Sequence, residues 1–286
     1  MHASDLLWFL FLVTAVAPMV QRRLLDLQRV RFLRSWERRR GSRVIALIHR
    51  QETMSLLGFP LIRYIDIQDS EELLRALRLT AEDMPIDIVL HTPGGLALAA
   101  EQIAHAICRR RAKVTVFVPH YAMSGGTLIA LAADEIVMDP NAVLGSLDPQ
   151  LGNHPAASIV RAVAWKTEHE QKIDDETLIL EDIARKAMFQ LRECVAAVLS
   201  DRFGPEKAAA LADTFTQGQW THDHPLNVET LTQLGLPINT DMPREIYDYM
   251  RLFPQASTGR PSVQYIPVPY RRSVPVPSPQ SKRAGG

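Results

Sequence analysis

The chain has 286 residues, of which 47% are apolar, 22% charged and 7% aromatic. This composition is typical of one globular domain with additional terminal segments. Because 32 Lys and Arg residues balance 32 Asp and Glu residues, no overall positive field would attract nucleic acid, and no nucleic-acid partner is expected. Cys108 and Cys194 form neither a CxxC nor a Cys/His pattern. They argue against a zinc site or a disulfide scaffold and favour reduced thiols in the cytosol.

An apolar run of fifteen residues, Leu6 to Val20, is interrupted only by Thr14 and Pro18. No basic segment precedes it and no A-x-A site follows it, so a cleaved secretory signal is disfavoured. As a helix the run would span about 22 Å, short of the roughly 30 Å hydrocarbon core. We therefore expect residues 1–20 to be a hydrophobic anchor helix that crosses with help from flanking residues or a thinned bilayer. A helix packed inside the protein or an oligomer is the alternative.

Residues 21–43 are strongly basic, with nine Arg against two acidic residues. If the anchor crosses the membrane, these arginines belong on the cytoplasmic side, and the main domain of a membrane-associated protein would face the cytoplasm. Leu25, Phe32, Leu33 and Trp36 lie among the arginines, which suits a helix on an anionic membrane surface. A solvated juxtamembrane helix is an equally good interpretation.

Residues 44–250 have the pattern of an α/β domain. Four short runs have the composition of buried strands: Val44–His49, Ile86–His91, Val114–Pro119 and Glu135–Met138. Helical segments separate them: Ser70–Leu79, Ala97–Arg110 and Thr127–Ala133. This alternation predicts a parallel sheet with right-handed crossovers.

A long helix is expected from Asp174 or Asp175 to about Ser200, because acidic residues at its start suit the positive end of a helix. Apolar residues recur with helical spacing over five turns. They are Leu180, Ile183, Ala184, Ala187, Met188, Leu191, Val195 and Leu199.

The last segment, residues 251–286, is rich in proline. Seven of the nineteen prolines lie from Pro254 onward, with Ser, Gln and basic residues and no apolar period. We expect a disordered or polyproline-II-like tail, either as a plain solvated segment or as a docking segment.

Two glycine-rich turns follow two of the expected strands, where open parallel sheets usually carry their sites. The first is HTPGG, residues 91–95, and the second is YAMSGGT, residues 121–127. Ser124 would lie at a strand-to-helix turn, where the free N–H groups of a helix favour developing negative charge. The paired glycines would bring an N–H close to a substrate oxygen, and the N–H of Gly125 would complete an oxyanion hole. A purely structural turn is the alternative on these residues alone, and neither turn is a P-loop or GxGxxG motif.

The segments HTPGGLALAAEQIAHAI, AMSGGTLIALAADEIVMDPNAVLGSLDPQLG and GQWTHDHPLNVETLTQLGLPI resemble the Clp-protease/crotonase superfamily. The resemblance is greatest to the signal-peptide-peptidase-A-like serine peptidases, and among them to the serine dehydrogenase proteinases, over about residues 44–240. It implies a Clp-protease/crotonase-like spiral of parallel βαβ units and a serine peptidase without a cofactor. It also implies Ser124 as nucleophile, Gly95 and Gly125 as oxyanion-hole donors, protein or peptide substrates, and a homo-oligomer that encloses its sites.

An attacking serine needs a base to accept its proton. By the same resemblance, the base of the histidine-using Clp peptidases would fall within residues 145–150, which contain no histidine. His120 and His154 do not fit that placement. A Ser–Lys dyad is therefore expected, in which burial depresses the pKa of a lysine until it acts as a neutral base.

Three lysines are candidates for this base. Lys186 falls on the polar side of the long helix, and Lys172 precedes an acidic cluster that would keep it charged. Lys166 lies where the resemblance places the dyad lysine, and it is the predicted base. A surface lysine beside Glu168 and Glu170 is the alternative interpretation of Lys166.

The segment Thr221–His224, THDH, invites a metal interpretation. Adjacent residues do not converge easily on one ion, and no further ligand pair supports them, so no metal is expected and a structural role is favoured. The sequence thus predicts a membrane-associated serine endopeptidase that uses Ser124 and Lys166. One alternative is a non-catalytic scaffold that retains the fold and binds a membrane or partner proteins. Acyl-CoA chemistry of the crotonase kind is another, and a serine at the nucleophile position argues against it.

Overall fold

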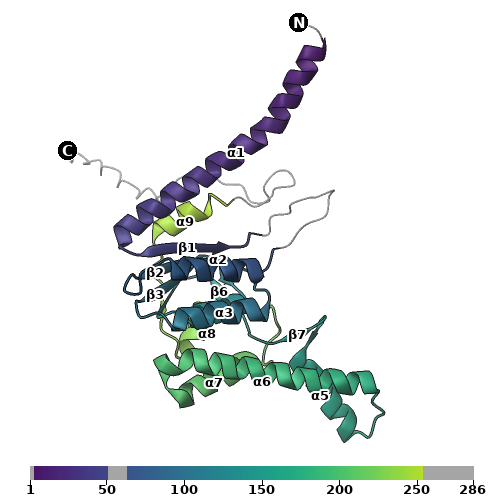
Figure 1. Cartoon of the computed structure of the whole chain (residues 1–286). Coiled ribbons are helices and arrows are strands. Elements are labelled where there is room, and N and C mark those ends of the chain that lie inside the picture. The colour runs from purple at the N-terminus through teal and green to yellow at the C-terminus, as the bar shows by residue number, and fades with distance from the viewer. Residues whose placement is uncertain (1–2, 51–62, 254–286) are drawn as a thin grey trace, which may run out of the picture. The chain divides into compact units, whose positions relative to one another are not determined.

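The computed structural model describes residues 3–50 and 63–253 (Figure 1). Both ranges lie within the first of two compact units, residues 1–255. Nearly all of the predicted proline-rich tail, from residue 254 onward, lies outside the described residues, and so do the side chains of residues 6–15 in the apolar run.

A five-stranded parallel sheet forms the centre of the unit, as the α/β pattern predicts. Its strands stand in the order β1-β2-β3-β5-β9. They are β1 (Arg43–Ile48), β2 (Ile86–His91), β3 (Val114–Val118), β5 (Glu135–Met138) and β9 (Ile238–Asn239). The first four agree with the predicted strands to within one residue at each end. Strand β9 was not predicted, because two residues carry no detectable alternation.

Helices α2 (Ile67–Arg78), α3 (Ala97–Cys108) and α4 (Gly125–Leu131) contribute to the larger core, against one face of the sheet. Helix α2 begins three residues before the predicted start. Its N-terminus is a capping box, in which Asp66 accepts a hydrogen bond from the backbone N–H of Asp69 and Asp69 accepts one from that of Asp66, each at 3.0 Å. The sheet residues on this face include Ile86, Ile88, Leu90, Val114, Val116 and Val118.

The opposite face of the sheet packs against α1 (Ala3–Arg40) and α9 (Arg244–Met250) (Figure 1). Trp36 is 3% exposed and Phe32 stacks on Tyr249 of α9 at 4.8 Å between ring centroids. Trp36 is therefore a core residue, and Phe32 and Leu33 pack, partly buried, against the same core. Assigning these three residues to a membrane surface or to solvent was wrong. The error arose because aromatic residues among arginines have the same pattern whether they face lipid or a sheet.

Helix α1 is continuous across the boundary expected between residues 20 and 21. None of the helices in the described part of the chain combines the length and the hydropathy that a bilayer crossing requires.

Helices α5 (Ala156–Glu168) and α6 (Asp175–Phe203) pack against each other. The predicted long helix is confirmed, and its second half buries Val195 and Leu199 in the larger core. The first half packs on α5 instead, and here Ile183, predicted on the apolar face, is 45% exposed. We call residues 156–190 the α5–α6 arm.

Short elements between the larger ones complete the unit. They are β4 (Tyr121–Ala122), β6 (Val143–Leu144), β7 (Gln150–Leu151), β8 (His154–Pro155), α7 (Pro205–Thr216) and α8 (Val228–Gln233). Strands β4 and β6 pair in parallel, and β7 and β8 form a small hairpin. They carry the segments that surround Ser124.

Candidate active site

Ser124 occupies the tight turn between β4 and helix α4, for which it is the N-cap residue. Its backbone angles are φ 50° and ψ −120°, and Glu170 is the only other described non-glycine residue with positive φ. This conformation costs a non-glycine residue about 1–3 kcal/mol, and such strain is concentrated at functional sites. The turn places the serine at the start of the helix, as in a nucleophile elbow.

The neighbouring glycine turn holds this elbow in place. Met123 N donates a hydrogen bond to Thr92 O at 3.0 Å. A methyl group on Gly94 would lie 2.7 Å from Ser124 Cβ, so only glycine permits the two turns to approach this closely. On the other side, the buried Thr127 hydroxyl donates to Ala122 O at 2.8 Å.

The glycines Gly95 and Gly125 line the same cavity as Ser124. Among the described residues, neither amide N–H has a hydrogen-bond acceptor. A methyl group built on Gly125 would be 3.8 Å from Gly95 N, which shows how closely the two glycines approach. Two unpaired N–H groups next to a nucleophile are the arrangement that stabilises an oxyanion.

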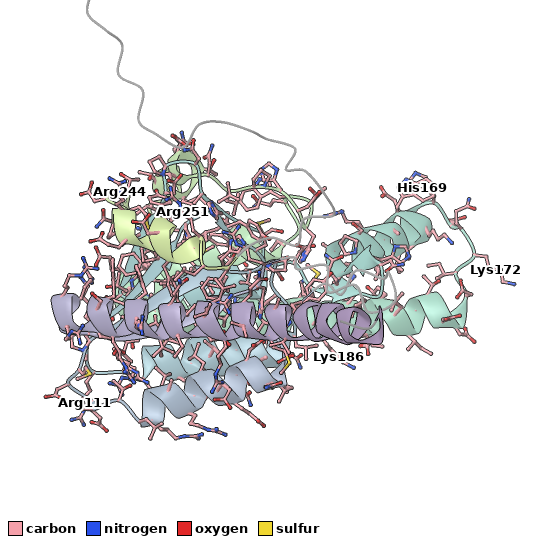
Figure 2. All side chains as sticks on the ribbon, turned by 90° about the horizontal axis from the view of Figure 1, so that it is seen from above. Arg111, His169, Lys172, Lys186, Arg244 and Arg251 are labelled. Atoms are coloured by element: carbon pink, nitrogen blue, oxygen red, sulfur yellow. The ribbon has the colours of Figure 1, made fainter. Side chains whose placement is uncertain are left out.

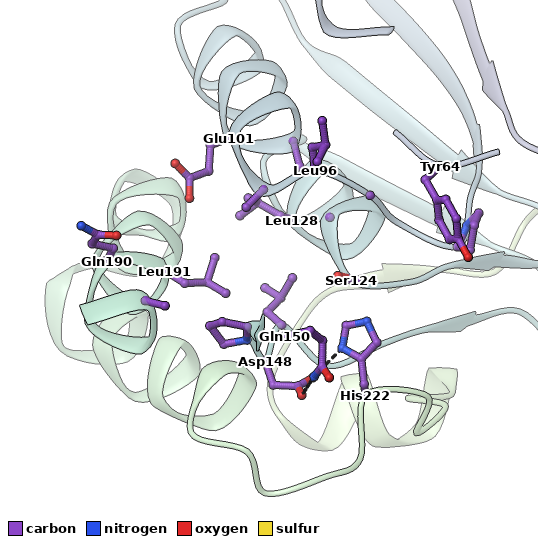
Figure 3. A pocket seen from close by; sticks show the side chains of 18 residues that line it. Tyr64, Leu96, Glu101, Ser124, Leu128, Asp148, Gln150, Gln190, Leu191 and His222 are labelled. Atoms are coloured by element: carbon purple, nitrogen blue, oxygen red, sulfur yellow. Dashed lines mark hydrogen bonds and ion pairs between the residues drawn. The ribbon is translucent and has the colours of Figure 1, made fainter. Parts of the chain in front are cut away.

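A cavity of about 460 Å³ opens at Ser124 (Figure 3). Apolar side chains from α3, α4 and α6 form much of its wall, and Asp148, Gln150 and His222 form a polar side. Its volume falls in the range of ligand pockets, which are mostly apolar with a few placed polar groups. The apolar lining includes Pro93, Leu96, Ala97, Ala100, Leu128, Leu147, Pro149, Ala187 and Leu191.

His222 and Asp148 form a hydrogen-bonded pair in the wall of this cavity. Nδ1 of His222 lies 2.8 Å from Oδ1 of Asp148, whose side chain is 1% exposed. The hydrogen bond to Asp148 raises the pKa of His222 above its usual 6.5, although burial opposes the change. Figure 3 shows the imidazole between Asp148 and Ser124.

The predicted base is not at this site. Lys166 lies in the last turn of α5, and it does not line the cavity that contains Ser124. Lys172 extends from the turn between α5 and α6, and Lys186 pairs with Asp182 on the surface at 2.5 Å (Figure 2). The structure thus brings Ser124, Gly95 and Gly125 together and leaves all three lysines outside.

Neither His222 nor Asp148 was predicted from the sequence to lie at this site. Asp148 lies in the segment 145–150, where a histidine was sought, and His222 was assigned a structural role within THDH. The sequence does show an aspartate in residues 145–150 and a histidine in the THDH segment. These two residues are 74 positions apart, and no local pattern relates them. In the described ranges, no three potential ligands are close enough to hold a metal ion.

Comparison with known proteins supports the assignment of the fold. The family of ClpP-like SDH-type serine proteinases matches residues 1–277. The chain belongs to this family.

Two relatives of this chain are the uncharacterized proteins MJ1495 and MJ0137 of Methanocaldococcus jannaschii. They are 54% and 50% identical, over 95% and 94% of this chain and 92% and 94% of their own length. A solved structure of a mutant 1510-N membrane-bound stomatin-specific protease is similar with a TM-score of 0.43 and 20% identity, covering 65% of this chain and 79% of that one.

Proposed function

We propose that this protein is a serine endopeptidase that hydrolyses peptide bonds through an acyl-enzyme on Ser124. The observation that carries the proposal is the strained Ser124 turn, which stands beside two amides without acceptors and opens on a cavity. The family to which the chain belongs supports the choice of reaction. A carbonyl carbon above Ser124 would be attacked by Oγ while its oxygen accepts hydrogen bonds from Gly95 and Gly125.

A fluorophosphonate probe tests this proposal without knowledge of the substrate. Wild-type protein should be labelled, and Ser124→Ala should not be, with an unchanged circular-dichroism spectrum. Ser158→Ala, on α5 and outside the cavity, is the matched control and should be labelled like wild type. Equal labelling of wild type and Ser124→Ala would contradict the proposal, and a folded wild type that neither labels nor cleaves peptides would favour the non-catalytic scaffold.

The protein is also proposed to form a homo-oligomer through the α5–α6 arm. Large apolar side chains are exposed there, and a second copy of the chain is the occupant we expect, because an oligomer would enclose an otherwise open peptidase site. Lys166 lies on the same arm, so it remains a candidate base only where the arm of one copy approaches the cavity of another. The exposed side chains are Trp165, Leu178, Ile179, Ile183 and Phe189.

Analytical ultracentrifugation tests the oligomer. Wild type should sediment as an assembly, and Ile179→Glu with Phe189→Glu should lower its mass, since charges would replace exposed apolar contacts. Lys186→Glu, a surface change on the same helix, should leave the mass unchanged. A monomeric wild type would overturn this part of the proposal.

Membrane contact through the part of α1 up to Leu27 is proposed as well. Met19, Leu24 and Leu27 are 71%, 54% and 47% exposed, and exposed arginines follow them on the same helix. An apolar stretch next to arginines suits an anionic lipid surface, and at the inner leaflet it would leave the peptidase unit in the cytoplasm.

Full-length protein should co-sediment with vesicles containing anionic lipid. Deletion of residues 2–20 with Leu24→Glu and Leu27→Glu should abolish this binding and keep the packed half of α1. If the full-length protein stays in the supernatant at moderate salt, the membrane proposal is wrong. A loss of oligomer mass in the same variant would instead assign this stretch to contact between copies.

A further inference from the structure

The peptide group that joins Gly94 to Gly95 is held by a short parallel strand pairing. Ile65 N donates a hydrogen bond to Gly94 O at 2.7 Å, and Leu96 N donates one to Ile65 O at 2.8 Å. In a trans peptide group, the C=O and the N–H point in opposite directions. Because the carbonyl of this group points to Ile65, the amide N–H of Gly95 points away from Ile65. The direction of this proposed oxyanion-hole donor therefore depends on how one peptide group is held.

A chain of hydrogen bonds through three side chains ends at the same peptide group. Gly94 N donates to Thr92 Oγ1 at 3.1 Å, and Thr92 Oγ1 lies 3.0 Å from Nδ1 of His49. Nε2 of His49 lies 3.2 Å from Oδ2 of Asp69. The side chains of Thr92 and His49 are buried. The chain thus connects the end of β1 and the first turn of α2 to the glycine turn of residues 91–95.

Every donor in this chain finds an acceptor when Asp69 is ionised. Burial would raise the pKa of Asp69, but hydrogen bonds from His49 and from the backbone N–H of Asp66 lower it below its usual value. An ionised carboxylate only accepts hydrogen bonds, so the proton of the neutral imidazole lies on Nε2. Nδ1 then accepts the hydrogen bond of the Thr92 hydroxyl, whose oxygen accepts that of Gly94 N–H. Because Asp69 also accepts from Asp66 N at 3.0 Å, one carboxylate fixes both the imidazole and the segment that pairs with the turn.

We infer that the chain from Asp69 through His49 to Thr92 positions the Gly95 amide for the oxyanion, an inference that rests on the proposed serine peptidase function. None of these three side chains lines the cavity that contains Ser124, so they are positioning residues that act through the turn. A fixed donor stabilises an oxyanion because it needs no reorganisation during the reaction. Misplacement of a group by about 1 Å can slow an enzyme about 100-fold.

The two branches of the Thr92 side chain can be tested separately. Its methyl group packs toward α4, since a methyl group built on Gly126 would lie 2.5 Å from it. Its hydroxyl makes the hydrogen bonds of the chain. Thr92→Val keeps the shape and removes the hydroxyl, whereas Thr92→Ser keeps the hydroxyl and removes the methyl group. Packing and positioning therefore predict opposite orders for these two variants.

The experiment measures fluorophosphonate labelling of full-length protein against probe concentration, which separates the maximal rate constant from the affinity for the probe. Thr92→Val should lower the maximal rate constant by about 10- to 100-fold and change the affinity little, because the displaced amide fails mainly in the transition state. Thr92→Ser should label close to the wild-type rate constant. Thermal unfolding of each variant shows that the labelled protein is folded.

Two amide side chains at position 49 separate the two nitrogens of the imidazole. The amide of Asn reaches the place of Nδ1, and the amide of Gln reaches the place of Nε2. His49→Asn keeps an acceptor for Thr92 and should label faster than His49→Gln. In the Gln variant, the Thr92 hydroxyl keeps Gly94 O, 3.4 Å away, as an acceptor, and a bond to it would pull on the peptide group itself. A role in stability alone predicts no such order.

Two control variants should label like wild type. His154→Gln, in the exposed β7–β8 hairpin, is the matched control for a histidine outside the chain. Asp87→Ala is the control for lost stability, because it removes a buried hydrogen-bond acceptor near the start of β2.

The inference is overturned if folded Thr92→Val labels like wild type, or if Thr92→Ser is as slow as Thr92→Val. Should Thr92→Val fail to fold, a His49→Gln variant that labels as fast as His49→Asn overturns it independently. Absence of labelling in wild type would instead refute the peptidase proposal, so the two failures are distinct.

Discussion

Trp36 Nε1 donates a hydrogen bond to Asp87 Oδ2 at 3.2 Å, which joins the amino-terminal helix to strand β2 of the central sheet. Asp87 is 2% exposed and also accepts hydrogen bonds from Arg40 Nε at 2.6 Å and Ser42 Oγ at 2.7 Å. The hydrogen bond to Asp87 raises the pKa of Arg40 above its usual value. Residues 36–42 are therefore part of the folded unit, and a deletion meant to release the chain from membranes must stop before them.

Replacing Asp87 tests this connection. We expect Asp87→Ala to lower the free energy of unfolding by about 3 kcal/mol, because buried donors on Trp36 and Ser42 lose their acceptor and Arg40 loses its partner. Asp182→Ala breaks an exposed pair with Lys186 and should change the free energy by about 0.5 kcal/mol or less. Urea unfolding measures both. Equal effects would mean that α1 contributes little to the stability of the unit.

Because Ser124 is strained, we expect glycine, compared with alanine, to raise the stability of the protein at position 124 and to lower it at Ser158. Ser124→Gly should be more stable than Ser124→Ala by about 1 kcal/mol, because relief of about 1–3 kcal/mol of strain exceeds the conformational entropy that glycine loses. In helix α5, Ser158→Gly should be less stable than Ser158→Ala by up to about 1 kcal/mol. Neither Ser124 variant should react with a fluorophosphonate. Thermal unfolding compares the four proteins, and a less stable Ser124→Gly would show that the turn is not strained.

The fit of α4 against α3 predicts a rescue. A methyl group on Gly125 would lie 2.8 Å from Ala100 Cβ, so Gly125→Ala should displace the oxyanion-hole amide and slow labelling, and should cost about 1–3 kcal/mol of stability. Adding Ala100→Gly removes the obstructing methyl group. The double variant should recover labelling, although glycine in α3 costs about 1 kcal/mol. A double variant no faster than Gly125→Ala would contradict the proposed contact.

The His222–Asp148 pair also predicts how stability depends on pH. Because the folded protein raises the pKa of His222 above 6.5, the protonated pair contributes stability that is fully present below pH 6.5. That contribution is lost as the pH rises through the raised pKa. The difference in unfolding free energy between wild type and His222→Gln should therefore be larger at pH 5.5 than at pH 9, by chemical denaturation. A difference that grows with pH would show that the pKa is not raised.

The strands and the two glycine turns could be predicted from the sequence because their signals are local. Apolar runs of four to six residues marked β1, β2, β3 and β5, and the glycines marked the turn that carries Ser124. Ser124, Gly95 and Gly125 meet because the carboxyl ends of neighbouring parallel strands share one edge of a sheet. That placement follows from the order of strands and helices alone.

The pairing of Asp148 with His222 in the cavity wall was decided only in three dimensions. Asp148 and His222 are 74 residues apart, and the segments that carry them meet at one antiparallel bridge between Leu144 and Leu226. The same is true of Trp36, whose burial depends on a sheet that the helix meets much later in the chain. Helix periodicity predicts which residues share a face of the helix. It does not predict what covers that face, because the covering residues lie far away in the chain and a single sequence holds no local signal for such a contact.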